Sequence, residues 1–240
     1  MRTTTLPSML EVLARNWNYR NKDVKLYEFA KIYKKRADGL ADEPKVLTLG
    51  AYGGDMDFYS LKGTVEELCD ALRIKDVEYV PVKDNPSYHP GRCAAFYAGG
   101  RCLGVFGQIH PLVAKNYGVS DELYAAEIDF AAMFENRTTE IYYTPLPRFP
   151  AVMRDISVVC DDAVTAGELS KCIKRAGGEY LESVEVFDVY KGANIPEGKK
   201  SVSFSLAIRS DEQTLTDSHA EEAVAAILSA LEKEYGAVMR

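Results

Sequence analysis

Residues 151–210, AVMRDISVVCDDAVTAGELSKCIKRAGGEYLESVEVFDVYKGANIPEGKKSVSFSLAIRS, decide the fold of the C-terminal part of the chain. Alternating apolar residues predict strands over residues 151–160, 180–190 and 200–210. Thr165 and Glu168 have the spacing of a capping box, which predicts a helix that ends at the Gly177-Gly178 pair. A longer helix near residues 218–235 and a short final segment, AVMR, complete the order β-α-β-β-α-β.

This order, in roughly 90 residues, predicts a ferredoxin-like domain with two helices on one face of a four-stranded sheet. The other face of the sheet is then open. In the strand at residues 200–210, small and polar side chains alternate with the apolar ones: Ser201, Ser203, Ser205, Ala207 and Arg209. Such a face can accept nucleobases or small ligands, and the fold alone does not decide between them.

Strand patterns dominate the first part of the chain. A helix from residue 6 and a strand near residues 24–32 come first, and strands at 46–53 and 77–83 enclose an amphipathic helix. Gly99-Gly100 between two apolar runs predicts a hairpin turn. A short helix at residues 110–117 and a last strand, LYAAEIDFAAMF at residues 123–134, follow. The sequence predicts a sequential antiparallel meander flanked by helices.

Residues 136–150 carry three prolines and interrupt the strand pattern, which indicates a linker between domains. We therefore expect one domain over residues 1–140 and a second over residues 141–240. The predicted fold class is α+β, with an antiparallel sheet and flanking helices followed by the ferredoxin-like domain.

The composition restricts the partners of the chain. Its 36 acidic and 29 basic residues give a net charge of −7, which argues against disorder and against a uniformly basic nucleic-acid-binding protein. Any nucleic-acid contact must be local. The sequence contains neither an apolar run of about 20 residues nor a signal peptide, and its five cysteines form no C-x-x-C pair. We expect a cytoplasmic protein with reduced thiols, no membrane association and no zinc site.

Several motifs together resemble one family. RFPAVMRDIS, FDVYKG, IPEGKKS and TLTD in the second half are similar to the ferredoxin-fold anticodon-binding domain of the bacterial phenylalanyl-tRNA synthetase β subunit. MRTTTLPSMLEVLARN, DVKLYEFAKIY, DFYSLKG, YHPGRCA and GQIHP resemble the catalytic-like domain of the same subunit, a relative of class II synthetase catalytic domains. The resemblance implies a class II-like sheet in the first domain and a chain that corresponds to the C-terminal part of a β subunit.

The resemblance also implies a division of labour. In this family the α subunit activates phenylalanine with ATP and Mg²⁺ and charges tRNA(Phe), whereas the β catalytic-like domain is a structural partner. We therefore expect no catalytic residue, metal or cofactor in this chain.

Four residues correspond to family positions that contact the first anticodon base: Asp188, Tyr190, Ser201 and Ser157. Tyr190 offers a ring on which a base can stack, and Asp188 can accept hydrogen bonds from guanine. The candidates for phosphate contacts are Lys191, Lys199, Lys200 and Arg209.

Other readings remain open at this point. The second domain could be an amino-acid-sensing regulatory module, although its first strand-to-helix loop contains only one glycine, Gly167. The chain could also be an assembly scaffold without RNA contact. His89 and Cys93 flank Pro90-Gly91, so their spacing does not place them on one helix face as a nucleophile pair. Arg92 is interpreted as an ion-pair partner.

Overall fold

The computed structural model describes residues 1–141, 143 and 145–240, and its contacts divide the chain into two compact units. Unit 1 spans Met1–Tyr142 and unit 2 spans Tyr143–Arg240. The predicted linker, residues 136–150, includes positions 142 and 144, which lie outside the described residues. No helix in the described part of the chain is long and apolar enough to span a membrane.

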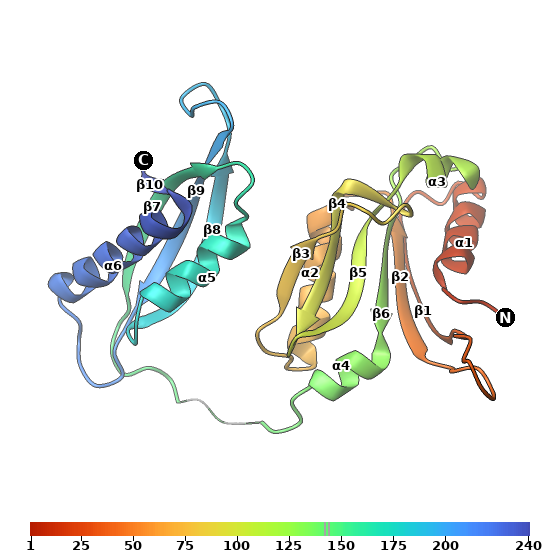
Figure 1. Cartoon of the computed structure of the whole chain (residues 1–240), viewed down its shortest axis with the longest axis horizontal. Helices are drawn as coiled ribbons and strands as arrows, with labels where there is room; N and C mark the ends of the chain where they lie inside the picture. Colours follow the sequence, from red (N-terminus) through yellow and green to blue (C-terminus); the bar gives the residue numbers. More distant parts are fainter. Residues whose placement is uncertain (142, 144) are drawn as a thin grey trace. The chain divides into compact units, whose positions relative to one another are not determined.

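Unit 1 is a six-stranded antiparallel sheet with helices on both faces (Figure 1). Its elements are α1 (Leu6–Asn18), β1 (Val24–Lys31), β2 (Lys45–Tyr52), α2 (Phe58–Ala71), β3 (Glu78–Pro81), β4 (Tyr88–Ala98), β5 (Arg101–Ile109), α3 (Pro111–Asn116), β6 (Tyr124–Asp129) and α4 (Phe130–Asn136). The strand order is β1-β2-β6-β5-β4-β3. The prediction of an antiparallel sheet is confirmed, but the sequential meander is wrong because β6 lies between β2 and β5.

The predicted strand at residues 123–134 is also wrong in its second half. The strand ends at Asp129, whose side chain accepts a hydrogen bond from the backbone N–H of Ala132 at 3.0 Å. This carboxylate caps a helix, α4, that contains FAAMF. The cap and the two alanines favour a helix over a continued strand.

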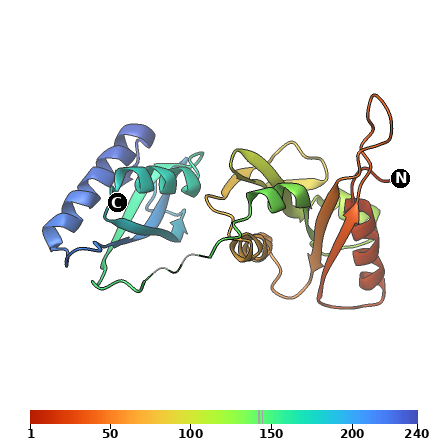
Figure 2. The same cartoon turned by 90° about the horizontal axis from the view of Figure 1, so that it is seen from below.

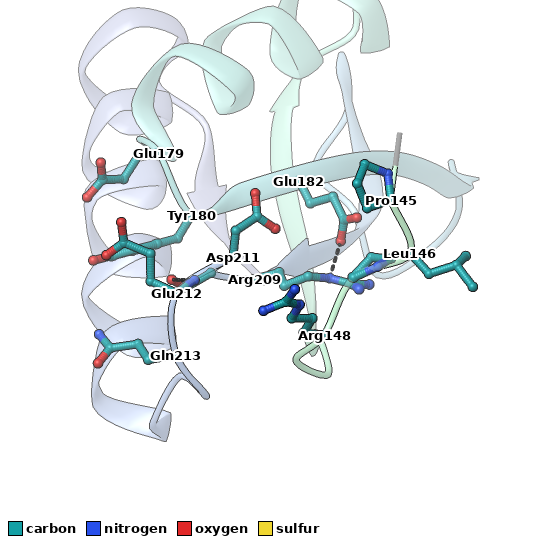
Figure 3. Close-up of a pocket in the computed structure, with 12 residues that line it drawn as sticks. Pro145, Leu146, Arg148, Glu179, Tyr180, Glu182, Arg209, Asp211, Glu212 and Gln213 are labelled. Atoms are coloured by element: carbon teal, nitrogen blue, oxygen red, sulfur yellow. Dashed lines mark hydrogen bonds and ion pairs between the residues drawn. The ribbon is translucent and has the colours of Figure 1, made fainter. Parts of the chain in front are cut away.

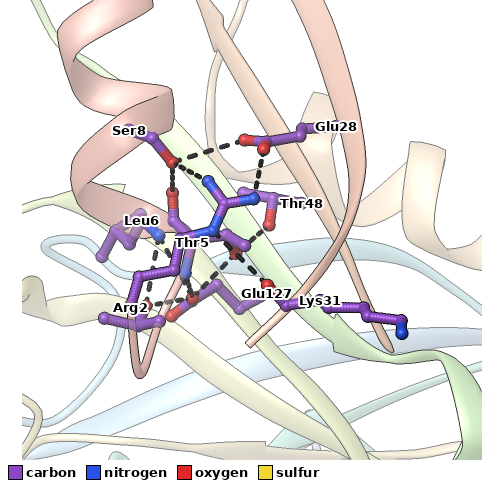
Figure 4. Close-up of polar contacts among 9 residues, drawn as sticks. Arg2, Thr5, Leu6, Ser8, Glu28, Lys31, Thr48 and Glu127 are labelled. Atoms are coloured by element: carbon purple, nitrogen blue, oxygen red, sulfur yellow. Dashed lines mark hydrogen bonds and ion pairs between the residues drawn. The ribbon is translucent and has the colours of Figure 1, made fainter. Parts of the chain in front are cut away.

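A polar row crosses the sheet beneath the first turn of α1. Glu28, Thr48 and Glu127 occupy matching positions on β1, β2 and β6, so their side chains lie on the same face. Glu127 Oε1 accepts hydrogen bonds from the backbone N–H groups of Thr5 at 3.1 Å and Leu6 at 3.3 Å (Figure 4). These contacts hold the start of α1 on the sheet.

Unit 2 has the predicted ferredoxin-like order. Its elements are β7 (Val152–Asp161), α5 (Ala166–Ala176), β8 (Leu181–Tyr190), β9 (Lys199–Ile208), α6 (Asp217–Tyr235) and β10 (Val238–Met239). The antiparallel sheet has the order β10-β7-β9-β8, and both helices lie on one face of it (Figures 1 and 2).

The core of unit 2 lies between this sheet and its two helices. It contains Ile156, Val158, Val202, Phe204 and Leu206 from the strands, packed against apolar side chains of α5 and α6. The capping box at the start of α5 is confirmed, with both of its reciprocal hydrogen bonds present. Residues next to these core positions along the strands face away from the helices.

Candidate nucleic-acid interface

A β-bulge in β8 decides which side chains reach the open face of unit 2. Before the bulge, Val184 and Val186 pair with the core residues Leu206 and Phe204 of β9. The register then shifts by one residue. After the shift Asp188 pairs with Ser203, and Tyr190 with Ser201.

Because paired residues share a face, the bulge turns Asp188 and Tyr190 from the helix-covered face to the open one. Val184 and Val186 remain on the face that packs against the helices. The bulge therefore creates the part of the open face on which the predicted base-contacting residues lie.

The first of two cross-strand rows on this face contains Ser157, Ser203 and Asp188. Ser157 on β7 pairs with Ser203 on β9, and their hydroxyl oxygens lie 2.8 Å apart. Asp188 on β8 completes the row and is exposed. The row thus presents two linked hydroxyl groups and a carboxylate side by side.

The second row contains Val159, Ser201 and Tyr190. Tyr190 is 38% exposed, whereas Ser201 is only 2% exposed. The hydroxyl of Ser201 is buried without a hydrogen-bond partner among the described residues. The expectation that Ser201 lies open to a base therefore needs correction, because neighbouring side chains cover it in the chain alone.

Two residues that are not among the predicted base-contacting residues contact the Tyr190 ring. The guanidinium carbon of Arg240 lies 5.4 Å from the ring centroid, within cation–π distance. Gly192 lies against the phenol, and a Cβ atom added there would be 2.2 Å from the Tyr190 hydroxyl oxygen. Glycine at position 192 is therefore required for this ring position.

The three predicted phosphate-contacting lysines lie at the same end of the sheet as Tyr190. Lys191 follows Tyr190 directly and forms an ion pair with Asp162 at 2.5 Å. The hydrogen bond and charge of Lys191 hold the pKa of the Asp162 carboxyl below its usual value. Lys200 donates to the backbone carbonyl of Asp162 at 2.9 Å, and Lys199 begins β9.

Arg209 does not join this group. It follows the other end of β9, eight residues from Ser201, which corresponds to about 26 Å along a strand. Its Nε atom lies 2.8 Å from Glu182, and it also donates to the backbone carbonyl of Phe149 at 3.3 Å. Arg209 thus lines a separate cavity with Arg148 and other polar residues (Figure 3).

In unit 1, the side chains that could carry chemistry make structural contacts instead. Arg92 forms an ion pair with Glu122 at 2.8 Å, which confirms its interpretation as an ion-pair partner. Cys93 is buried, and burial raises the pKa of its thiol to about 11. His89 accepts a hydrogen bond from the backbone N–H of Gly91 at 3.0 Å. These contacts are local, and none of them joins His89 to Cys93 as a nucleophile pair would require.

Known proteins match both units. Residues 1–130 match the family model of the phenylalanyl tRNA synthetase beta chain CLM domain. The chain belongs to this family. Residues 147–240 match the ferredoxin-fold anticodon binding domain, which confirms the fold predicted for the second half.

Similar curated proteins are phenylalanine–tRNA ligase beta subunits. The protein from Clostridium acetobutylicum is 42% identical over 242 residues, and that from Bacillus subtilis is 36% identical over 253 residues. Both comparisons include all of this chain but only 30% and 31% of the relative. The chain therefore spans slightly less than a third of the length of these family members.

Among solved structures, a pyrrolysyl-tRNA synthetase from Desulfitobacterium hafniense aligns with 60% of this chain and 55% of its own. The sequence identity is 12% and the TM-score is 0.46. This likeness is too weak to assign a function to the family member described here.

Proposed function

We propose that this chain acts within a phenylalanine–tRNA ligase, in which residues 141–240 bind the anticodon of tRNA(Phe). Tyr190 stacks on the first anticodon base, and Asp188 accepts hydrogen bonds from the edge of guanine. Ser157 and Ser201 supply hydroxyl groups beside it, while Lys191, Lys199 and Lys200 contact phosphates. The observation that carries this proposal is the bulge in β8, which places an aromatic ring and a carboxylate together on the open face.

Residues 1–140 are proposed to be a non-catalytic partner of the α subunit. Their surface includes an aromatic patch, defined as Tyr27, Phe29, Phe130 and Phe134, whose rings are 38–76% exposed. Phe29 and Phe130 lie 4.7 Å apart between ring centroids. Contiguous exposed aromatic rings are typical of protein interfaces, so this patch supports α-subunit binding.

The proposed ligase uses ATP and Mg²⁺ in the α subunit. Within the described residues of this chain, no group of three or more His, Cys, Asp or Glu side chains is placed to hold a metal ion. We propose that ATP and Mg²⁺ act in the α subunit and that this chain supplies no catalytic step. Its proposed location is the cytoplasm, where tRNA charging occurs, without contact with DNA or membrane.

Binding to anticodon stem-loop RNA tests the anticodon proposal. Fluorescence anisotropy should show tighter binding of a hairpin with guanine at the first anticodon position than of one with adenine. Tyr190→Ala should weaken binding of the guanine hairpin by about fivefold or more, because base–aromatic stacking contributes roughly 1–3 kcal/mol. Tyr19→Ala, which removes a 76% exposed tyrosine in unit 1, is the matched control. Equal affinity for both hairpins would refute the proposal.

Asp188→Asn tests the base-reading part separately. The amide keeps the size of the side chain but replaces one acceptor oxygen with a donor. We expect the preference for guanine over adenine to fall by about tenfold, with little change for the adenine hairpin. An unchanged preference would exclude Asp188 from base recognition.

The amino-acid-sensing alternative is not favoured, since one matching family model describes a synthetase domain and the other an anticodon binding domain. Titration calorimetry with free phenylalanine tests it directly. Saturable heat with phenylalanine, together with no binding of the guanine hairpin, would reverse this preference.

For the α-subunit surface, co-purification of the α subunit should be lost with Phe29→Ser and retained with Tyr59→Ser.

A further inference from the structure

Two long side chains from opposite edges of the unit 2 sheet meet above its open face. Arg240 follows β10 at one edge, and Tyr190 ends β8 at the other. Strands β7 and β9 lie between them, so the two backbones are separated by about 14 Å at a spacing of about 4.8 Å per strand. The guanidinium carbon and the ring centroid are nevertheless only 5.4 Å apart. The two side chains together must therefore span β7 and β9.

The serines on this face have an unusual burial pattern. Both helices of unit 2 lie on the other face of the sheet, yet Ser201 and Ser203 are only 2% and 6% exposed. Tyr190 pairs with Ser201, and the Arg240 backbone lies beside Ser157, so the contact between the two side chains is on the face that carries these serines. The Ser201 hydroxyl lacks a hydrogen-bond partner among the described residues. A buried hydroxyl in this condition is costly unless a ligand satisfies it.

The backbone fixes the position of Arg240. Its N–H donates to the carbonyl of Ser157 at 2.9 Å, and Val238 and Met239 pair with Val159 and Val158. Alternation along β10 then places the Arg240 side chain on the same face as Ser157. Arg240 is therefore held beside the row that contains Ser157 and Asp188, and its guanidinium points toward Tyr190.

We propose that Tyr190 and Arg240 form a base clamp, in which the phenol ring and the guanidinium stack on opposite faces of the first anticodon base. This inference rests on the proposed anticodon function and adds Arg240 as a base-contacting residue. A base between the two planar groups needs a wider gap than the present 5.4 Å contact, and rotation of these two exposed side chains provides that space.

The chemistry of arginine distinguishes this role from a phosphate contact. A guanidinium is planar and stacks on nucleobases, whereas the ammonium group of lysine is a compact charge without a stacking face. If Arg240 stacks on the base, Arg240→Lys loses affinity for the guanine hairpin although the positive charge remains. If Arg240 contacts a phosphate, Arg240→Lys keeps most of this affinity. The base beneath the guanidinium also brings a polar edge close to the Ser201 hydroxyl.

The test combines protein variants with a change in the RNA. The 240-residue chain is measured by anisotropy with the guanine hairpin and with the same hairpin lacking only that base. Arg240→Ala and Arg240→Lys should each weaken binding of the guanine hairpin by about tenfold. Binding of the abasic hairpin should change by less than about twofold. Arg175→Ala, on α5 and paired with Glu234, is the control and should change neither.

The outcomes separate the clamp from the function beneath it. If the wild-type chain binds the guanine and abasic hairpins equally, the anticodon proposal itself fails. If it prefers guanine but Arg240→Ala weakens both hairpins by the same factor, Arg240 contacts the backbone of the RNA and the clamp is wrong. Retention of wild-type affinity by Arg240→Lys would also overturn it. Thermal unfolding of each variant identifies any loss of folding, and the lysine variant retains the charge and the backbone pairing of β10.

Discussion

Glu127 is predicted to be a main stabilising residue of unit 1, because one carboxylate oxygen holds the start of α1. Glu127 Oε1 accepts from the backbone N–H of Thr5 and of Leu6, and from the hydroxyls of Thr4 and Thr5 (Figure 4). The negative charge also lies at the positive end of the helix dipole. Replacing Glu127 removes all these contacts at once.

The expected cost follows from the number and type of these bonds. A hydrogen bond to a charged group contributes roughly 1.5–3 kcal/mol, but the freed amides of Glu127→Ala regain part of this from water. We expect a loss of about 2–4 kcal/mol in the free energy of unfolding of unit 1. Glu127→Gln keeps an acceptor oxygen without the charge and should lose about half as much. At roughly 2–4 °C per kcal/mol, Glu127→Ala lowers the Tm of unit 1 by about 5–15 °C.

The single tryptophan makes this measurable in unit 1 alone. Trp17 lies in α1, and its ring centroid is 5.7 Å from that of Tyr52 in the same unit. Tryptophan emission during heating or urea titration therefore reports unit 1 without a signal from unit 2. Glu135→Ala, which breaks an exposed ion pair with Arg101, is the control and should cost less than about 0.5 kcal/mol. A loss for Glu127→Ala no larger than this control would refute the reasoning.

Three further predictions concern single contacts. Gly192→Ala adds a Cβ atom 2.2 Å from the Tyr190 hydroxyl oxygen, so the ring must move, and anisotropy should show several-fold weaker binding of the guanine hairpin. Thr165→Ala removes the capping box of α5 and should cost about 1 kcal/mol in urea unfolding followed by circular dichroism. Burial raises the pKa of the Cys69 and Cys93 thiols to about 11. The neutral thiols therefore stabilise unit 1 fully below pH 9 and lose this contribution as the pH rises through 11, and alkylation rates followed by mass spectrometry should reach half-maximum near pH 11.

Most helices and strands could be predicted because their signals are local. The apolar alternation of β9, the Thr165–Glu168 capping box and the Gly99-Gly100 turn each depend on a few neighbouring residues. Both turn glycines have positive φ, +55° and +76°, as a two-residue hairpin requires. The place of β6 in the centre of the sheet depends on pairing between distant segments, which no local pattern contains.

Contacts between distant residues also explain which parts of the candidate site could not be predicted from the sequence. Arg240 reaches Tyr190 only because β10 adds to the edge of the sheet, and its position at the end of the sequence gives no sign of this. Charge alone groups Arg209 with the lysines, although it follows the other end of β9. Charge and sequence distance do not show which end of a strand a side chain occupies.

The bulge in β8 shows most clearly why the open face depends on three-dimensional pairing. In VEVFDVY, strict alternation would put Val184, Val186, Asp188 and Tyr190 on one face, and the two valines belong to the helix-covered side. Asp188 and Tyr190 would then lie under the helices, where a carboxylate is costly. The extra residue, Phe187, is absorbed on an edge strand, where only one neighbouring strand must adjust its pairing. The same sequence thus keeps Val184 and Val186 on the helix-covered face and presents its carboxylate and ring to a ligand, which makes the bulge the structural basis of the proposed interface.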